Sequence, residues 1–510
     1  MFAHGVASGD PLPDGVVIWT RVSPPSGRPS SVGWRVATTS DLGAPVAAGQ
    51  VEAAPENDFT VKVDVRGLEP ATAYHYGFTA DGTASPVGRT RTAPAGPTER
   101  VRIGVVSCAC WPHGFFNAYR HLADRDVDLV LHLGDYIYED GGSWDEAGRS
   151  HEPPRRLRTL ADYRARHAQY KTDPDLRRLH ERHPVIAIWD DHDLADGAWW
   201  DGAARHDKRK DGDWARRRDA AIRAWVEWLP VRLRDDDHPE RIYRSFRLGD
   251  LAHLAVVDSR LVGRDRPPAD GKRTVLTVEE PDRSMLGADQ RRWLQHELRS
   301  SAGRWQLLAN QVMMAPLRAL ELPRPLRWLV PGLVAGGAGI NGGQWDGYPG
   351  EREALFRLVR GEGIVNFVVL SGDLHSSWAG ELTDPAGEEP AVGVEFVAPS
   401  VTSRAFSGQV APRLPGARAA LRRLVATQNP HFRYFDLDQH GYLVVDVTAD
   451  QVRTQFWHVD TVAHRAAGEY LAAEWLARDG EARLVAGRRP VRPPSGPPDR
   501  RPWRGRASRR

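Results

Sequence analysis

The first ninety or so residues alternate apolar and polar positions with the period of a β-strand. Residues 15–22 form a β-branched and aromatic run bounded by turn residues, and residues 61–65 alternate with a period of two. Residues 68–74 read Leu-Glu-Pro-Ala-Thr-Ala-Tyr, a corner typical of chains that enter a strand of a β-sandwich. The pattern predicts an N-terminal β-sandwich domain over residues 1–95, which ends in a Pro/Gly linker.

Beyond this linker, apolar strands alternate with stretches of helical spacing. The expected strands are residues 101–106, 127–133, 185–189, 307–312 and 365–370, followed by an antiparallel pair at 441–447 and 452–457. Helical spacing occurs at 114–125 and at 204–228, the second being a charged surface helix. Alternation of this kind predicts a layered α/β domain over residues 96–480. Pro, Arg and Gly dominate residues 481–510, which predicts a disordered tail.

Composition narrows the class of protein without naming a function. The chain has 510 residues, 41% of them apolar, and a formal charge of +2, which argues against electrostatic capture of nucleic acid or anionic membrane. No apolar run is long enough to span a bilayer. The two cysteines, Cys108 and Cys110, stand too close together for an ordinary disulfide and are either buried bystanders or metal ligands. We expect a monomer with no specific nucleic-acid partner and no transmembrane segment.

Candidate chemistry gathers where the α/β strands end. These positions carry Ser107-Cys108, Gly134-Asp135-Tyr136-Ile137-Tyr138, Asp190-Asp191-His192-Asp193, Asn310 and Gly372-Asp373-Leu374-His375. Singly, each has a structural alternative: a buried thiol, a carboxylate that caps a helix, a solvated acidic loop, or an amide that turns the chain. Because ligands collect at the carboxyl ends of parallel strands, their joint occurrence favours one metal-centred hydrolase site.

These motifs resemble the PhoD-like alkaline phosphatase and phosphodiesterase family, within the calcineurin-like metallophosphoesterases. The resemblance covers residues 3–462 and rests on residues 3–11, 107–108, 134–139, 189–193, 310–314, 345–348, 371–375 and 396–403. It implies an immunoglobulin- or fibronectin-like β-sandwich followed by a four-layer α/β/β/α metallophosphoesterase domain.

The resemblance also implies a site that holds ferric iron (Fe³⁺) and calcium (Ca²⁺). Asp135 would bridge the two metals. Matching motifs assign Cys108, Tyr138 and His375 to iron, and Asp191, Asn310 and Asp373 to calcium. This division agrees with the preference of calcium for oxygen ligands and the acceptance of softer donors by iron. Asp190 and Asp193 are candidates for further calcium contacts.

The implied reaction is phosphoester hydrolysis. Two cations would clamp the phosphoryl group and activate a water that attacks phosphorus in line with the leaving alkoxide. Asp135 and His192 would be catalytic; His192 would also bind a phosphoryl oxygen or protonate the leaving group, and Arg404 is a further substrate-binding candidate.

Two other functions are weighed against an alkaline phosphatase or phosphodiesterase. One is a phospholipase D-type phosphodiesterase that acts on phosphatidylcholine. The other is a non-catalytic surface-binding module, which predicts missing ligands. Relatives imply secretion by the twin-arginine route, so we expect the chain to be a mature form given a starting Met.

Overall fold

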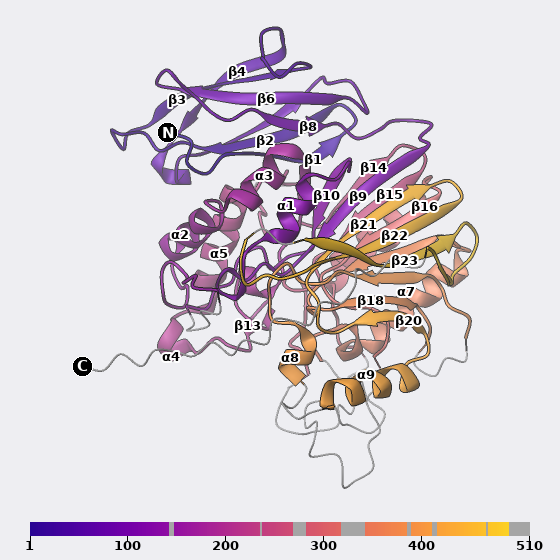
Figure 1. The fold of residues 1–510 in the computed structure, drawn as a ribbon. Coiled ribbons are helices and arrows are strands. Elements are labelled where there is room, and N and C mark those ends of the chain that lie inside the picture. Colours follow the sequence, from indigo (N-terminus) through magenta and orange to yellow (C-terminus); the bar gives the residue numbers. More distant parts are fainter. Residues whose placement is uncertain are drawn as a thin grey trace.

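The computed structural model describes residues 1–141, 147–234, 237–268, 282–317, 342–384, 389–410, 416–465 and 468–488. Its N-terminal part is a β-sandwich that lies at one end of the molecule (Figure 1). The outer sheet has the order β4–β3–β6–β7 and contains β3 (Ser30–Ala37), β4 (Pro45–Ala53), β6 (Ala73–Ala80) and β7 (Thr83–Ala84), with β8 (Gly88–Arg91) also paired to β6. The predicted corner is confirmed, since the hydroxyl of Tyr74 accepts a hydrogen bond from the backbone N–H of Glu69 at 3.0 Å.

The inner sheet of the sandwich is also the edge of the main catalytic-domain sheet. This ten-stranded sheet runs β24 (Leu484–Ala486), β23 (Glu469–Arg478), β22 (Gln451–Val459), β21 (Gly441–Thr448), β9 (Arg100–Val106), β10 (Leu129–His132), β11 (Pro184–Ala187), β1 (Val6–Leu12), β2 (Gly15–Arg21) and β5 (Thr60–Arg66). Strand β1 pairs in parallel with β11, so the two parts share one hydrogen-bonded ladder. Gly9 permits the close approach, because a Cβ there would lie 2.5 Å from the carbonyl oxygen of Val185.

A second sheet of seven strands packs against the first. Its order is β14 (Arg244–Leu248), β15 (Ala252–Val256), β16 (Trp305–Ala309), β17 (Phe367–Ser371), β19 (Val394–Val397), β18 (Ser377–Glu381) and β20 (Phe432–Asp436). Alternation along β16 shows the layering: Leu307 and Ala309 belong to the core between the sheets, whereas Leu308 belongs to the core under the outer helices. Both faces of the strand are therefore buried, which explains its continuous apolar sequence.

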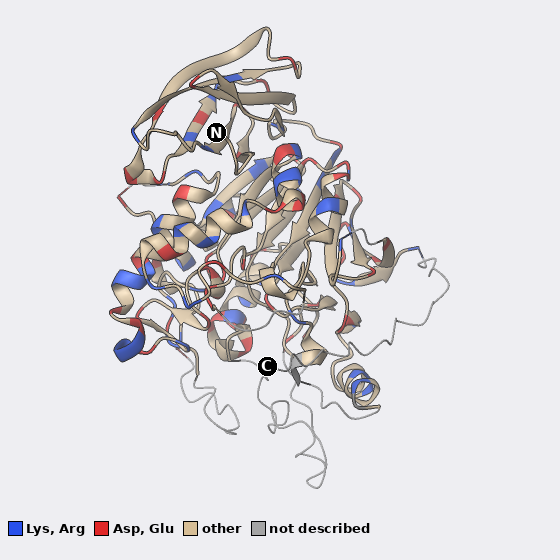
Figure 2. Ribbon diagram, turned by 60° about the vertical axis from the view of Figure 1, so that its left-hand side comes forward, with Lys and Arg blue, Asp and Glu red and all other residues tan. Residues whose placement is uncertain are grey.

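Helices cover the outer faces of the two sheets and complete four layers. The first set is α1 (Asn117–Ala123), α2 (Leu160–Tyr170), α3 (Pro174–Arg182), α4 (Lys208–Asp211) and α5 (Trp214–Trp228); the second is α6 (Gly287–Ser300), α7 (Pro349–Gly361), α8 (Phe406–Val410) and α9 (Ala417–Gln428). Figure 1 places α1, α2, α3 and α5 on one side of the strands and α7 on the other. Acidic and basic residues are interspersed along both parts of the molecule (Figure 2). The expected β-sandwich and α/β/β/α architecture are confirmed.

Two sequence-based expectations need adjustment. The helix expected over residues 204–228 is α5 alone with a short α4 before it, because Gly212 has a φ of +84° between them and Asp213 caps α5. In the tail expected from residue 481, residues 484–486 form β24 and pair with β23; residues 489–510 lie outside the described residues. Within the described chain, every helix is too short or too polar to cross a membrane.

Candidate active site

Cys108 stands directly beyond the end of β9 and is fully buried. Its φ of +61° turns the chain out of the strand, and its N–H donates to the carbonyl oxygen of Gly134 at 3.1 Å. The next residue, Ala109, donates to the carbonyl oxygen of Asp135 at 3.0 Å. These two bonds hold the end of β9 against the loop that follows β10. Burial, and then the charge of Asp135, raise the pKa of the Cys108 thiol well above its ordinary value in the metal-free chain.

Asp135 is the point where the strand-end loops meet. Gly134 before it has a φ of +94°, and a Cβ there would lie 2.5 Å from the backbone nitrogen of Asp190. Asp135 itself has a φ of +53° and is buried. One carboxylate oxygen accepts from the hydroxyl of Tyr138 at 2.8 Å and the other from the backbone N–H of His192 at 3.2 Å. The carboxylate therefore faces the other loops instead of capping a helix.

The first group of candidate ligands is Cys108, Asp135 and His375, whose donor atoms all lie within 4.8 Å of one another. Tyr138 joins them: its hydroxyl lies 3.2 Å from His375 Nε2 and accepts from Ser403 Oγ at 2.5 Å. His375 Nδ1 lies 3.1 Å from the carbonyl oxygen of Arg404. Because a carbonyl only accepts, Nδ1 carries the proton, and the lone pair of Nε2 points toward the group.

The second group is Asp190, Asp191 and Asp373, again with donor atoms within 4.8 Å of one another. The buried guanidinium of Arg260 lies among them: Nε contacts Asp190, one terminal nitrogen contacts Asp373, and the other lies 3.6 Å from Asp191. Burial lowers the pKa of Arg260, but the three carboxylates together raise it well above its ordinary value. Burial raises the pKa of Asp190 well above its ordinary value, although Arg260 opposes this rise. Two further carboxylates share the one guanidinium, an arrangement suited to a cation.

Asn310 lies beside the second group, in a local hydrogen-bonded turn. Its amide nitrogen donates to the carbonyl oxygen of Val312, and its amide oxygen accepts from Trp345 Nε1 at 3.3 Å. The turn that the sequence left open as an alternative is thus present. A carbonyl oxygen has two lone pairs, so one remains after the bond from Trp345. Gln344, next to Trp345, donates to Asp373.

His192 is held from two sides. Its Nδ1 lies 2.7 Å from Glu139 Oε2, and its ring stacks on Tyr138 with centroids 4.3 Å apart. Glu139 is fully buried, and its other oxygen accepts from the N–H of Asp196 at 2.8 Å. Burial lowers the pKa of His192, but Glu139 and Asp135 raise it well above its ordinary value. This pairing fixes the ring and leaves Nε2 as the nitrogen for other contacts.

Three residues that the sequence singled out lie outside the two groups. The carboxylate of Asp193 accepts from the backbone N–H groups of Ile137 at 3.0 Å and Asp190 at 2.9 Å, so it supports the loop; burial and the charge of Asp135 raise its pKa to about 8. Cys110 is buried, which raises its pKa to about 12, and it belongs to neither group. Arg404 reaches His375 through its backbone carbonyl.

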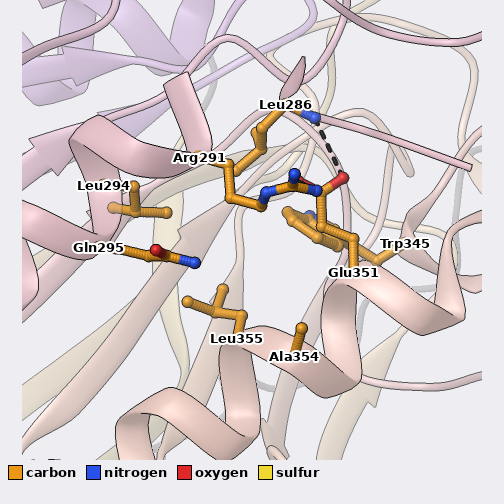
Figure 3. A pocket seen from close by; sticks show the side chains of 8 residues that line it. All are labelled: Leu286, Arg291, Leu294, Gln295, Trp345, Glu351, Ala354 and Leu355. Atoms are coloured by element: carbon orange, nitrogen blue, oxygen red, sulfur yellow. Dashed lines mark hydrogen bonds and ion pairs between the residues drawn. The ribbon is translucent and has the colours of Figure 1, made fainter. Parts of the chain in front are cut away.

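A pocket between α6 and α7 lies apart from this chemistry (Figure 3). Its volume is about 20 Å³, room for about one water molecule. The carboxylate of Glu351 accepts from the N–H of Leu286 at its rim, and Trp345 lines it. A gap of this size is a packing defect between two helices and not a substrate site.

Sequence reasoning missed four residues at the site: Arg260, Glu139, Gln344 and Ser403. Arg260 was detectable, because Asp258-Ser259-Arg260 follows an apolar run at 251–257 and β15, like the other strand ends. Glu139 lies in the motif at residues 134–139, but no role was expected for it. Ser403 likewise lies in the motif at residues 396–403, for which no role was expected. Nothing local distinguishes Gln344, which reaches the site only through the packing of distant loops.

The fold and the site define a metallophosphoesterase: a four-layer α/β/β/α domain whose strand ends bring together thiol, carboxylate and imidazole groups that could hold a metal. The profile of the PhoD-like phosphatase family matches residues 103–456, and that of its N-terminal domain matches residues 1–94. The chain belongs to the PhoD-like phosphatase family. It is a metal-dependent hydrolase of phosphoric esters.

Individual relatives agree with this assignment. Alkaline phosphatase D of Bacillus subtilis (strain 168) is 34% identical over 473 residues, which cover 89% of this chain and 77% of that protein. The solved structure of PhoD matches with a TM-score of 0.82 at 31% identity, and the match covers 97% of this chain and 92% of that one. The similarity therefore extends through both the sandwich and the catalytic domain.

Proposed function

We propose that the protein is a secreted, monomeric alkaline phosphatase with one ferric ion and one calcium ion bridged by Asp135. The observation that carries this proposal is the presence of two unlike groups of candidate ligands linked by Asp135, whose carboxylate lies within 4.8 Å of donor atoms of Cys108 and His375 and also of Asp191. Family membership supports secretion. The match of the N-terminal profile to residues 1–94 supports a boundary near residue 95, with the catalytic domain over residues 96–480.

The first group fits ferric iron. Cys108, Tyr138 and His375 offer a thiolate, a phenolate and an imidazole, which are strong or soft donors. All are buried or half-buried, and the Tyr138 hydroxyl already lies within hydrogen-bonding distance of two other ligands. The raised pKa values of the Cys108 thiol and the Tyr138 hydroxyl belong to the metal-free chain, since a bound cation deprotonates such ligands.

The second group fits calcium. Asp191 and Asp373 offer carboxylate oxygens, Asp190 offers further oxygens, and Asn310 offers the second lone pair of its amide oxygen. Calcium takes six to eight oxygen ligands and tolerates irregular geometry. Arg260 offsets part of the charge, which lets two buried carboxylates and the half-buried Asp373 stay close together before the cation binds.

The residues of the chain prepare the substrate for in-line displacement. When bound, the two cations neutralise charge on the phosphoryl oxygens and lower the pKa of a coordinated water. His192 contacts a phosphoryl oxygen or passes the proton on Nε2 to the leaving alkoxide, and Glu139 keeps its ring in place. Arg404 is a second contact for substrate oxygens.

The test is a comparison of metals and substrates on the purified enzyme. Elemental analysis should give iron and calcium, and a tyrosinate–iron bond should give a visible absorbance band. A colourless, iron-free but active enzyme would contradict the iron assignment. Hydrolysis of p-nitrophenyl phosphate should exceed that of bis-p-nitrophenyl phosphate and phosphatidylcholine; the opposite order would make the protein a diesterase or a phospholipase D-type enzyme.

A further inference from the structure

Buried hydrogen-bond donors gather at the seam between the N-terminal sandwich and the helices of the catalytic domain. Lys171 follows α2, is 1% exposed, and places its ammonium 4.4 Å from the ring centroid of Trp19 on β2 and 5.6 Å from that of Tyr136. Around it lie the buried imidazoles of His4, His132, His167 and His180 and the indole of Trp228. Figure 1 shows the sandwich strands above α3 at this seam.

Several of these nitrogens have no hydrogen-bond partner among the described residues. They are Nζ of Lys171, Nδ1 of His4, His132 and His180, both ring nitrogens of His167, and Nε1 of Trp228. Buried polar groups in proteins are almost always hydrogen-bonded, because an unpaired one loses its hydration without compensation. A set of this size in one place indicates an occupant that the chain itself does not supply.

Two of these imidazoles are paired with tyrosine hydroxyls. Tyr119 lies 2.8 Å from Nε2 of His132, and Tyr136 lies 2.9 Å from Nε2 of His180, and either partner can donate in such a pair. In the tautomer in which the hydroxyl donates, Nδ1 carries the ring proton and is a donor. Trp228 Nε1 and Lys171 Nζ donate in either case. The occupant must therefore accept hydrogen bonds.

The charge of the seam matches a single negative charge. Burial lowers the pKa of His4, His132 and His167 to about 3, so these imidazoles are neutral near pH 7. Among the described residues, no carboxylate forms an ion pair with Lys171, and burial alone accounts for its lowered pKa. The two aromatic rings stabilise an ammonium without neutralising it. An isolated buried ammonium is costly unless a counter-charge accompanies it.

We propose that the seam binds one monovalent inorganic anion of chloride size, held by Lys171, Trp228 and the Nδ1 donors of His132 and His180. Lysine suits this position, because its ammonium is a compact charge with three donors, and only five of the 69 basic residues of the chain are Lys. The anion would join the end of α2, β10, α3 and α5 next to Trp19 of β2, and so stabilise the part of the catalytic domain on which the sandwich packs. This inference is independent of the metals and of the substrate.

The experiment measures the effect of halide on the stability of the full-length enzyme. Urea unfolding is followed in chloride, bromide and gluconate at one ionic strength, since a ligand at about one hundred times its Kd shifts the unfolding equilibrium about a hundredfold. Chloride and bromide should stabilise the wild type. Lys171→Met should lose that response, and Lys208→Met, which removes an exposed lysine, should keep it.

Crystals of the wild type grown in bromide give a second readout that does not depend on a variant that folds. An anomalous peak within hydrogen-bonding distance of Lys171 Nζ, together with halide-dependent stability, supports the proposal. Equal stability in chloride and gluconate would overturn it, and so would ordered water in place of bromide. A peak without any effect on stability would mean binding at crystal concentration only, which also overturns it.

Discussion

The two ligand groups of the site are organised by different forces. Around Cys108, Tyr138 and His375 the chain satisfies its own polar groups: Ser403 donates to the Tyr138 hydroxyl, and the Arg404 carbonyl accepts from His375. Around Asp190, Asp191 and Asp373, by contrast, carboxylates outnumber their one cationic partner, Arg260. The first group is therefore positioned by hydrogen bonds before metal binds. The second is held by charge and completed only by a cation.

Asp135 belongs to the first group and also lies within 4.8 Å of donor atoms of Asp191 and His192, so its replacement should have the largest effect. Asp135→Asn removes the charge that both cations share, and metal contacts contribute several kcal/mol to transition-state stabilisation, so turnover should fall about a thousandfold. Iron and calcium should both be reduced in elemental analysis. As a control, Asp193→Asn alters a buried carboxylate bonded to backbone N–H groups and should retain both metals. If Asp135→Asn lost only one of the two metals, Asp135 would not be shared by the two groups.

Arg260 tests the charge-held group. Arg260→Gln leaves the carboxylates without their cationic partner. The free energy of unfolding of the metal-free protein should fall by about 3 kcal/mol. This is near the low end of the loss expected when a buried ion pair is broken, because Asp373 is partly exposed. Saturating calcium should restore most of that loss in a urea titration. The control Arg352→Gln breaks a buried ion pair with Asp346 outside the site. Calcium should not restore the free energy of unfolding that this variant loses. Equal responses of the two variants would refute the charge argument.

Tyr138 tests the hydrogen-bonded group. Tyr138→Phe should abolish the visible absorbance band and reduce iron affinity about tenfold to a hundredfold, the range found when groups that support a metal are removed. Calcium content should stay normal, since among the described residues the Tyr138 hydroxyl contacts Asp135 but none of the carboxylates of the second group. The control Tyr136→Phe removes a hydroxyl that contacts His180 instead, and this variant should keep the band. A band that survives in Tyr138→Phe would assign the colour to Cys108.

The smallest effect should come from Trp345, which reaches the second group through Asn310. Trp345→Phe removes the indole N–H that orients the amide oxygen, and calcium affinity should fall by about tenfold or less. Isothermal titration with calcium measures the change. If neither Trp345→Phe nor Asn310→Ala changed the calcium affinity, Asn310 would be a turn residue only.

Local sequence signals predicted that the candidate ligands would lie close together, because strand ends bring them to one edge of the sheet. Gly134-Asp135 and Gly372-Asp373 each follow an apolar strand, and parallel strands bring their carboxyl ends to one edge. The left-handed φ values of Cys108, Asp135, Asp373 and His375 were not predictable, since such conformations are unfavourable for these residues in isolation. They persist because contacts between loops hold them.

Non-local pairings account for the rest of what the sequence did not reveal. Arg260 was one arginine among many until the fold placed it between three carboxylates. The sandwich was expected as a separate unit, and its two sheets were predicted from turns and alternation. That its inner strands also extend the catalytic sheet depends on pairing between β1 and β11, for which no short-range pattern exists.

That shared ladder bears on how the chain is made. Ser8 pairs with Pro184, and Val105 at the centre of the same sheet pairs with Leu443. During synthesis, β1 thus lacks its neighbour β11 until Pro184 has emerged, and β9 lacks its neighbour β21 until Leu443 has emerged. Loop closure over such separations slows folding and prolongs the exposure of open strand edges. Yield in a heterologous host should therefore depend on protection of a nascent β-sheet, more than on the stability of the finished enzyme.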